Sequence, residues 1–132
     1  MTEIKKTILL RHRDIPDLNR LDVYLKHGGF DTWHKVVTHM QPGQVTEIVK
    51  ASGLRGRGGA GFPTGMKWAF IDNQNWPHYV VANADESEPG TFKDREIMEH
   101  NPFQFLEGLA MCAFAVQAHA AYIYLRGEFW QV

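Results

Sequence analysis

The segment from residue 54 to residue 65 limits most strongly what this chain can fold into. It holds five glycines, too many for the interior of a helix or strand. Glycines let the backbone approach a ligand closely and aim successive N–H groups at phosphate oxygens, while arginine or lysine neutralises the charge. We therefore expect a shaped loop that suits a phosphate-bearing ligand. The five are Gly56, Gly58, Gly59, Gly61 and Gly65.

This loop lacks the spacing of the common nucleotide-binding fingerprints. The nucleoside-triphosphatase loop ends in Gly-Lys followed by Ser or Thr, whereas here Met66 separates Gly65 from Lys67. A Rossmann fingerprint follows a strand, and no strand pattern precedes this loop. On spacing alone, a purely structural or linker role therefore stays open.

A second polar segment, residues 83–90, reads Asn-Ala-Asp-Glu-Ser-Glu-Pro-Gly and directly follows a predicted strand. α/β proteins place their ligands at the carboxyl ends of such strands. If Asp85, Glu86 and Glu88 line a cleft, they can accept hydrogen bonds from ligand hydroxyl groups. If they are solvated, the segment is only a hydrophilic turn, and spacing cannot choose between the two interpretations.

The pattern around these segments predicts an α/β fold. Residues 1–52 are expected to form a helical lead-in, with helices over residues 18–25 capped by Asp17, over residues 33–40 capped by Asp31 or Thr32, and from Pro42 to Gly53. Residues 53–132 are expected to form the first part of a Rossmann-like parallel-sheet domain.

Within that second part, strands are predicted at residues 78–83 and 121–126, with short helices at residues 66–71 and 93–100. A buried apolar helix at residues 102–118 would connect the strands in parallel through a right-handed crossover. Because parallel sheets normally have several strands, the domain is expected to be incomplete within this chain.

Composition excludes several classes of protein. The chain has 132 residues, 44% of them hydrophobic, and a net charge of -1, which is typical of a soluble globular protein and argues against nucleic acid or an anionic membrane as partner. Residues 103–121 are interrupted by polar side chains, so no membrane insertion is expected. The single cysteine, Cys112, and the absence of a signal-peptide pattern favour the cytoplasm. No histidine spacing predicts a metal site.

Residues 52–68 and 83–95 together closely resemble the flavin subunit of bacterial respiratory complex I, the NADH-quinone oxidoreductase. The resemblance continues more weakly through residues 106–108 and 122–128. It implies an F-type subunit that holds FMN, accepts hydride from NADH and passes electrons to a 4Fe-4S cluster. It also implies E-type and G-type partner subunits and a position peripheral to the inner membrane.

The same resemblance implies a set of ligand-binding residues. FMN is expected to contact the loop, Lys67 and the acidic turn, while NADH is expected to use the loop together with Phe62 and Phe70, and to lie near Glu86 and Glu88. No side chain need act as an acid or base, because hydride passes between cofactors. The full set is Gly56, Arg57, Gly58, Gly59, Ala60, Gly61, Phe62, Pro63, Thr64, Gly65, Lys67, Phe70, Asn83, Asp85, Glu86 and Glu88.

Some features of that family are missing from this chain. A 4Fe-4S cluster normally takes four thiolates, and the chain has one cysteine, so the cluster ligands are absent here. Activity is therefore expected to belong to a complete subunit. Two alternatives stay open: a diaphorase subunit of an NAD-linked hydrogenase or formate dehydrogenase, and a truncated, non-catalytic binding or assembly module.

Overall fold

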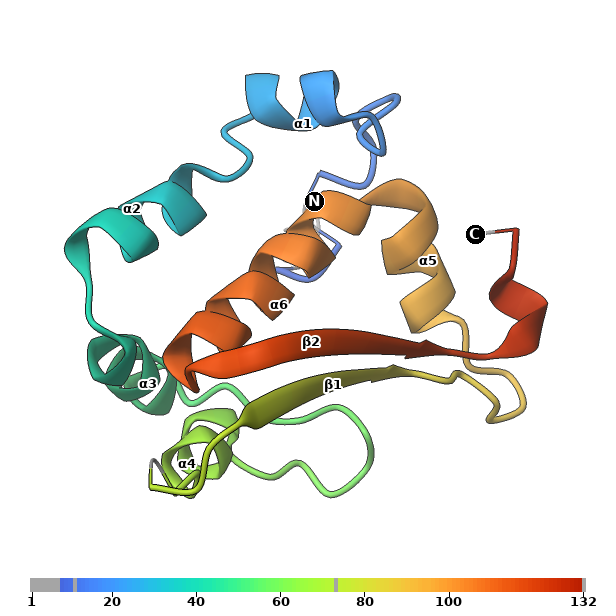
Figure 1. The fold of residues 1–132 in the computed structure, drawn as a ribbon. Helices are drawn as coiled ribbons and strands as arrows, with labels where there is room; N and C mark the ends of the chain where they lie inside the picture. The colour runs from blue at the N-terminus through green and yellow to red at the C-terminus, as the bar shows by residue number, and fades with distance from the viewer. Residues whose placement is uncertain (1–7, 11, 73, 132) are drawn as a thin grey trace, which may run out of the picture.

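The computed structural model of the chain describes residues 8–10, 12–72 and 74–131 (Figure 1). Helices precede and follow the first of two strands. The elements in chain order are α1 (Leu21–Lys26), α2 (Asp31–His39), α3 (Pro42–Ala51), α4 (Thr64–Ala69), β1 (His78–Ala84), α5 (Lys93–His100), α6 (Pro102–Ala115), β2 (Ala118–Leu125) and the 3-10 turn η1 (Gly127–Phe129).

The two strands pair in parallel, with Val80 opposite Ala121 and Ala82 opposite Ile123. The connection between them contains α5 and α6, and α6 runs along one side of the sheet (Figure 1). Parallel strands need a long crossover, and an apolar helix that packs on the sheet supplies it. The predictions of an α/β fold and of parallel pairing are confirmed.

The hydrophobic core joins the lead-in helices to the later part of the chain. Its buried centre is formed by Val36 of α2, Val45 of α3 and Ala115 of α6. Side chains of α4 and α6, Trp68 and Phe114 among them, pack against this centre. The core therefore fixes α4, and the loop that leads into it, relative to the sheet.

Helix α3 begins and ends where local signals predict. Pro42 occupies the first turn, and the side chains of Gln41 and Gln44 make a reciprocal capping box with the backbone there. At the other end Gly53 has a φ of 67°, the left-handed conformation that ends helices and that glycine adopts without strain. The predicted limits of this helix are confirmed.

The predicted caps of the first two helices are wrong. Asp17 has a φ of 57°, whereas an N-cap residue is usually extended, and α1 begins only at Leu21, after the turn that contains the buried Leu18. Helix α2 is preceded by Phe30 in the left-handed conformation, without a cap from its own neighbouring side chains.

The elements around the loop and the crossover differ from prediction by two or three residues. Helix α4 already begins at Thr64, directly after Pro63 in an extended conformation. Helix α6 ends at Ala115 rather than at residue 118, and β2 begins earlier than predicted, at Ala118. The reason is Gln117, whose φ of 51° ends the helix and turns the chain into the strand.

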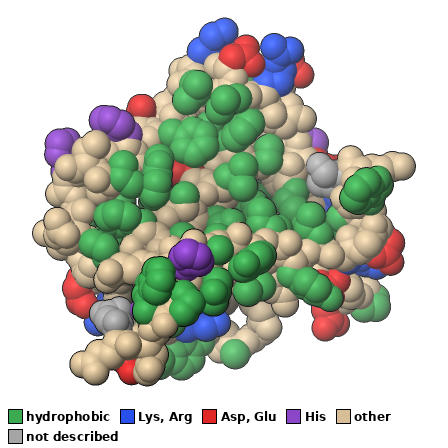
Figure 2. Space-filling view, viewed as in Figure 1, with side chains coloured by type: hydrophobic (Ala, Val, Ile, Leu, Met, Phe, Trp, Pro, Cys, Tyr) green, Lys and Arg blue, Asp and Glu red, His purple; other side chains and the backbone are tan. Residues whose placement is uncertain are grey.

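The composition of residues 78–83 is that of a buried strand and α6 is expected to be buried, but β1 is partly exposed and α6 is only partly buried. Tyr79 and Val81 of β1 are 53% and 63% exposed, and Leu106 of α6 is exposed as well. Figure 2 shows hydrophobic side chains gathered on the face of the molecule seen in Figure 1. A two-stranded sheet with α6 on one side leaves its other face uncovered by the described residues.

Within the described residues, no helix is long and apolar enough to cross a membrane.

Candidate ligand-binding cleft

The glycine-rich segment is a loop that the chain itself pins at its base. Arg55 and Pro63 form an isolated antiparallel bridge, and the Gly56 N–H donates to the Phe62 carbonyl at 2.9 Å. The Arg55 guanidinium also donates to the Gly61 carbonyl at 3.0 Å. These contacts hold residues 57–61 as the tip of the loop, which confirms the prediction of a shaped loop.

The tip of the loop needs glycine and presents its backbone outward. Gly59 and Gly61 have φ values of 110° and 61°, which other residues rarely adopt. A Cβ on Gly58, Gly59 or Gly61 would meet nothing within 4 Å, so the space beside them is open. None of the described residues accepts a hydrogen bond from the N–H groups of Gly58, Gly59 or Ala60. Consecutive N–H groups at an exposed loop tip, without a partner among the described residues, suit an anion.

A cleft of about 570 Å³ lies between this loop, α4, β1 and α6. One wall is formed by the loop and by Lys67, and the other is largely apolar, with Trp68 and Val80 among its side chains. The volume lies in the range typical of small-molecule and cofactor sites. A ligand with a phosphate group and a flat apolar ring would match the two walls.

Part of the predicted site meets at this cleft. The predicted residues that line it are Gly56, Gly58, Ala60, Gly61, Phe62, Thr64 and Lys67. Others of the loop segment and α4 are neighbours in sequence but do not line it, namely Arg57, Gly59, Pro63, Gly65 and Phe70. The acidic-turn residues Asn83, Asp85, Glu86 and Glu88 lie outside it, beyond the end of β1 or at its last residues. Along β1, Asn83 shares a face with Tyr79 and Val81, which line the cleft.

The aromatic residues predicted to stack on NADH are paired and exposed. The ring centroids of Phe62 and Phe70 lie 6.1 Å apart, and both side chains are accessible. Phe62 lines the cleft, so the pair lies at its edge. Gly65, in contrast, is buried with the backbone of Lys50 against it, which gives that glycine a packing role.

The acidic turn divides its carboxylates between solvent and the interior. Asp85 and Glu88 are exposed, whereas Glu86 is only 4% exposed. Exposed Asp85 accepts a hydrogen bond from the Ser87 hydroxyl at 2.7 Å, and its N–H donates to the Asn83 side chain at 2.9 Å. The repulsion expected among three neighbouring carboxylates is thereby reduced, because one of them points inward.

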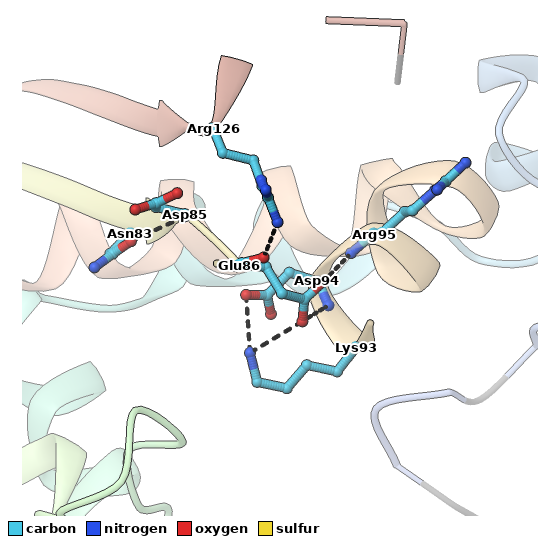
Figure 3. Close-up of polar contacts among 7 residues, drawn as sticks. All are labelled: Asn83, Asp85, Glu86, Lys93, Asp94, Arg95 and Arg126. Atoms are coloured by element: carbon cyan, nitrogen blue, oxygen red, sulfur yellow. Dashed lines mark hydrogen bonds and ion pairs between the residues drawn. The ribbon is translucent and has the colours of Figure 1, made fainter. Parts of the chain in front are cut away.

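The carboxylate of Glu86 is held at the beginning of α5 (Figure 3). Its oxygens accept the N–H groups of Asp94 at 2.9 Å and Arg95 at 3.1 Å, and the Lys93 ammonium lies 3.5 Å away. Burial acts to raise the pKa of Glu86, but these hydrogen bonds and the charge of Lys93 outweigh burial and lower the pKa below its ordinary value. Glu86 is therefore an ionised, buried carboxylate.

Arg126, just after β2, holds the same turn from the other side (Figure 3). Its guanidinium donates to the Glu86 carbonyl at 2.6 Å and to the Glu128 carboxylate at 2.8 Å. The second contact lowers the pKa of Glu128 to about 2. Sequence reasoning assigned Arg126 no role, although its place after a predicted strand, matching that of the acidic turn after β1, could have indicated one.

Sequence reasoning also missed the apolar wall of the cleft, including Cys112. Burial raises the pKa of the Cys112 thiol to about 11, so this thiol is protonated at neutral pH and is a poor nucleophile.

Among residues 8–10, 12–72 and 74–131, no three His, Cys, Asp or Glu side chains are grouped to hold a metal ion.

Known proteins are similar to this chain in sequence and in fold. Over 123 residues the chain is 52% identical to the second of the F-type NADH-quinone oxidoreductase subunits of Rhizobium meliloti (strain 1021), a match that covers 92% of the chain and 29% of that relative. It is 46% identical over 127 residues to the F-type NADH-quinone oxidoreductase subunit of Aquifex aeolicus (strain VF5), covering 96% of the chain and 30% of the relative. The chain thus spans under a third of the length of these relatives.

Among solved structures, the fold is similar to that of an NAD+-reducing NiFe-hydrogenase in the air-oxidized state. The TM-score is 0.67 at 43% sequence identity, over 69% of this chain and 16% of that chain. The family model described as the Nuo51 FMN-binding domain matches residues 49–132, which include the loop, the cleft and the acidic turn. The chain therefore belongs to the Nuo51 FMN-binding domain family.

Proposed function

We propose that this chain forms one wall of the cleft in which the NADH-oxidising flavoprotein subunit of an NADH-quinone oxidoreductase binds FMN and NADH. The observation that carries the proposal is the loop tip, where Gly58 and Ala60 line a cleft of about 570 Å³ and their N–H groups have no partner among the described residues. An open glycine backbone beside an apolar wall fits a flavin nucleotide, which has a phosphate and a flat ring.

Each predicted residue group has its own task in this proposal. The residues from Gly56 to Gly65 supply backbone donors and close approach to the phosphates, and Lys67 supplies positive charge beside them. Phe62 and Phe70 offer ring faces at the edge of the cleft, and Asn83, Asp85 and Glu88 supply acceptors at the end of β1. FMN, when bound, supplies the chemistry of accepting a hydride from NADH. The protein binds and orients both molecules.

The wider assignments belong to the complete subunit. The division into a lead-in of residues 1–52 and a cofactor-binding part of residues 53–132 is part of the proposal. So are electron transfer to a 4Fe-4S cluster held elsewhere, association with E-type and G-type subunits, and a cytoplasmic place peripheral to the inner membrane. The named sequence relatives are F-type subunits of NADH-quinone oxidoreductases, which favours this assignment over a hydrogenase or formate dehydrogenase diaphorase.

A grafted subunit tests the proposal. The chain replaces the matching 127-residue stretch in the Aquifex aeolicus relative, and the purified product is assayed for bound FMN and for NADH oxidation with ferricyanide as acceptor. We expect both properties to be retained. We expect Lys67→Ala to weaken FMN or NADH binding about tenfold, because a charge-assisted contact to phosphate is lost.

The matched control is Lys35→Ala, on the exposed side of α2 and away from the cleft, which should bind both molecules normally. Lys50 is less suitable as a control, because it is partly buried, pairs with Glu47 and packs behind Gly65. A folded graft without FMN, or equal behaviour of the Lys67 and Lys35 variants, would count against the proposal.

A further inference from the structure

We infer that Glu86 is a positioning residue, which ties the turn after β1 to the first turn of α5 and so fixes where Asp85 and Glu88 stand. This inference rests on the proposed function, because it concerns the acceptors at the end of β1. It differs from what the family resemblance implies for Glu86, which is contact with the cofactors. Glu86 acts through the backbone of α5 and does not touch the ligand.

The capping of α5 is the first observation. Helix α5 has no side-chain cap from Phe92, the residue at its start. The N–H groups of Asp94 and Arg95 are the two that a local cap would satisfy, and Glu86 accepts both, from a position well before the helix in sequence. A local cap would stabilise α5 alone. The distant cap also joins α5 to the end of β1.

The backbone of Glu86 provides the second observation. Its carbonyl accepts the Arg126 guanidinium at 2.6 Å, which links the turn to the end of β2. The residue is therefore held by β1 through the chain, by α5 through its carboxylate and by β2 through its carbonyl (Figure 3). The neighbours on either side, Asp85 and Ser87, remain exposed.

Direct binding of a ligand by the Glu86 carboxylate does not fit this arrangement. The side chain is 1% exposed, and each of its oxygens already accepts a backbone N–H. Asp85 and Glu88 are exposed and suited to face a ligand. The competing interpretation is that Glu86 only stabilises α5, without any effect on the ligand beyond stability.

A rescue experiment separates these two roles in the grafted subunit. Glu86→Ala removes the distant cap, and Phe92→Asn adds a local, uncharged one at an exposed position, since Asn is among the best capping residues. We expect Glu86→Ala to lower the midpoint of thermal unfolding and to raise the FMN dissociation constant about tenfold. In the double variant, the midpoint should recover while the dissociation constant stays raised. Phe92→Asn alone is the control and should bind FMN normally, because its side chain adds no charge beside Glu86.

The outcomes are distinct. An unmutated graft that folds but holds no FMN overturns the proposed function, and this inference with it. Normal FMN binding by Glu86→Ala overturns this inference alone. Recovery of both the unfolding midpoint and the FMN affinity in the double variant also overturns it. A positioning role requires that the local cap restores the midpoint while the FMN affinity stays low.

Discussion

Gly65 closes the glycine-rich segment against α3, where its Cα faces the backbone of Lys50. A Cβ at this position would lie 2.7 Å from the Lys50 Cα, closer than real Cβ contacts allow. Gly59, by contrast, has open space around it and a φ of 110°. One glycine is thus required by packing and the other by backbone conformation.

We expect Gly65→Ala to destabilise the chain by about 1–3 kcal/mol, because a methyl group overpacks the contact between α4 and α3. The matched control is Gly43→Ala, also in a helix, where a Cβ meets nothing within 4 Å. That variant should be as stable as the wild type or slightly more so. Urea unfolding followed by circular dichroism measures both. Equal stability of the two variants would refute the packing role of Gly65.

At this scale the sequence predicts residue types better than their surroundings. The open loop around Gly58 and Gly59 follows from glycine content alone, and the structure agrees. The inward turn of Glu86 between exposed Asp85 and Ser87 does not follow, because a run of acids looks the same in sequence whether one of them is buried or none is. Its partners belong to α5, which only the fold brings near.

Two helices of this chain begin with caps supplied by distant glutamates. Glu86 caps α5, and Glu107 of α6 does the same for α2, accepting the N–H groups of Phe30 at 3.2 Å and Trp33 at 3.1 Å. The Tyr24 hydroxyl donates to Glu107 at 2.6 Å, so α1 is joined to the same point. The carboxyl group of Glu107 thus joins α6 to α1 and α2, two helices that lie far from α6 in sequence.

We expect Tyr24→Phe to destabilise the chain by about 1 kcal/mol, since a buried hydrogen bond to the Glu107 carboxyl group is lost. Amide hydrogen exchange should rise at Phe30 and Trp33, which share the Glu107 carboxylate. The control is Tyr122→Phe, because Tyr122 is an exposed tyrosine of β2. If Tyr24→Phe instead raised the exchange rates of all amides by a similar factor, a local role for this contact would be refuted.

Helix limits were predictable where their signals are local. Pro42 and Gly53 mark α3 from within its own sequence, and the structure follows them. For α2 the sequence offered Asp31 or Thr32 as caps, but Glu107 supplies the acceptor from another helix. Propensity describes neighbours in sequence, so a cap delivered by tertiary packing lies beyond it.

The whole molecule exposes far more surface than its mass requires. Its accessible area is 9992 Å², whereas a folded monomer of 15.1 kDa exposes roughly 7,100 Å². The exposed large apolar side chains include Tyr79, Tyr122 and Tyr124 on one face of the sheet. Figure 2 shows hydrophobic side chains over the face that it presents. No large side chain among the described residues is fully buried.

We therefore expect the chain by itself to be marginally stable and to bind the dye ANS at neutral pH, because large apolar patches are accessible. The grafted subunit should bind much less dye per molecule, since further residues of that subunit are available to cover this face. Fluorescence titration compares the two proteins. A cooperative, high-melting transition of the isolated chain without dye binding would contradict this expectation.

At the scale of the fold, the sequence predicts the order of elements and the direction of the strands. A strand, a helix and a second strand in succession favour parallel pairing of the two strands, and β1 and β2 pair in parallel. The exposure of Tyr79 and Val81 could not be predicted, because β-branched and aromatic residues favour strands whether or not a second layer covers them.

The bridge between Arg55 and Pro63 and the bond from Gly56 to Phe62 have a consequence for the rate and strength of binding. Because these contacts hold the base of the loop in the folded chain, the phosphate of the proposed function would meet a loop whose base is already formed. The entropy of ordering that base is lost before association, not during it. Binding should therefore proceed as a single step without a slow phase of loop closure. Its affinity should depend on the contacts between loop and ligand, and little on the conformational entropy lost when the loop becomes ordered.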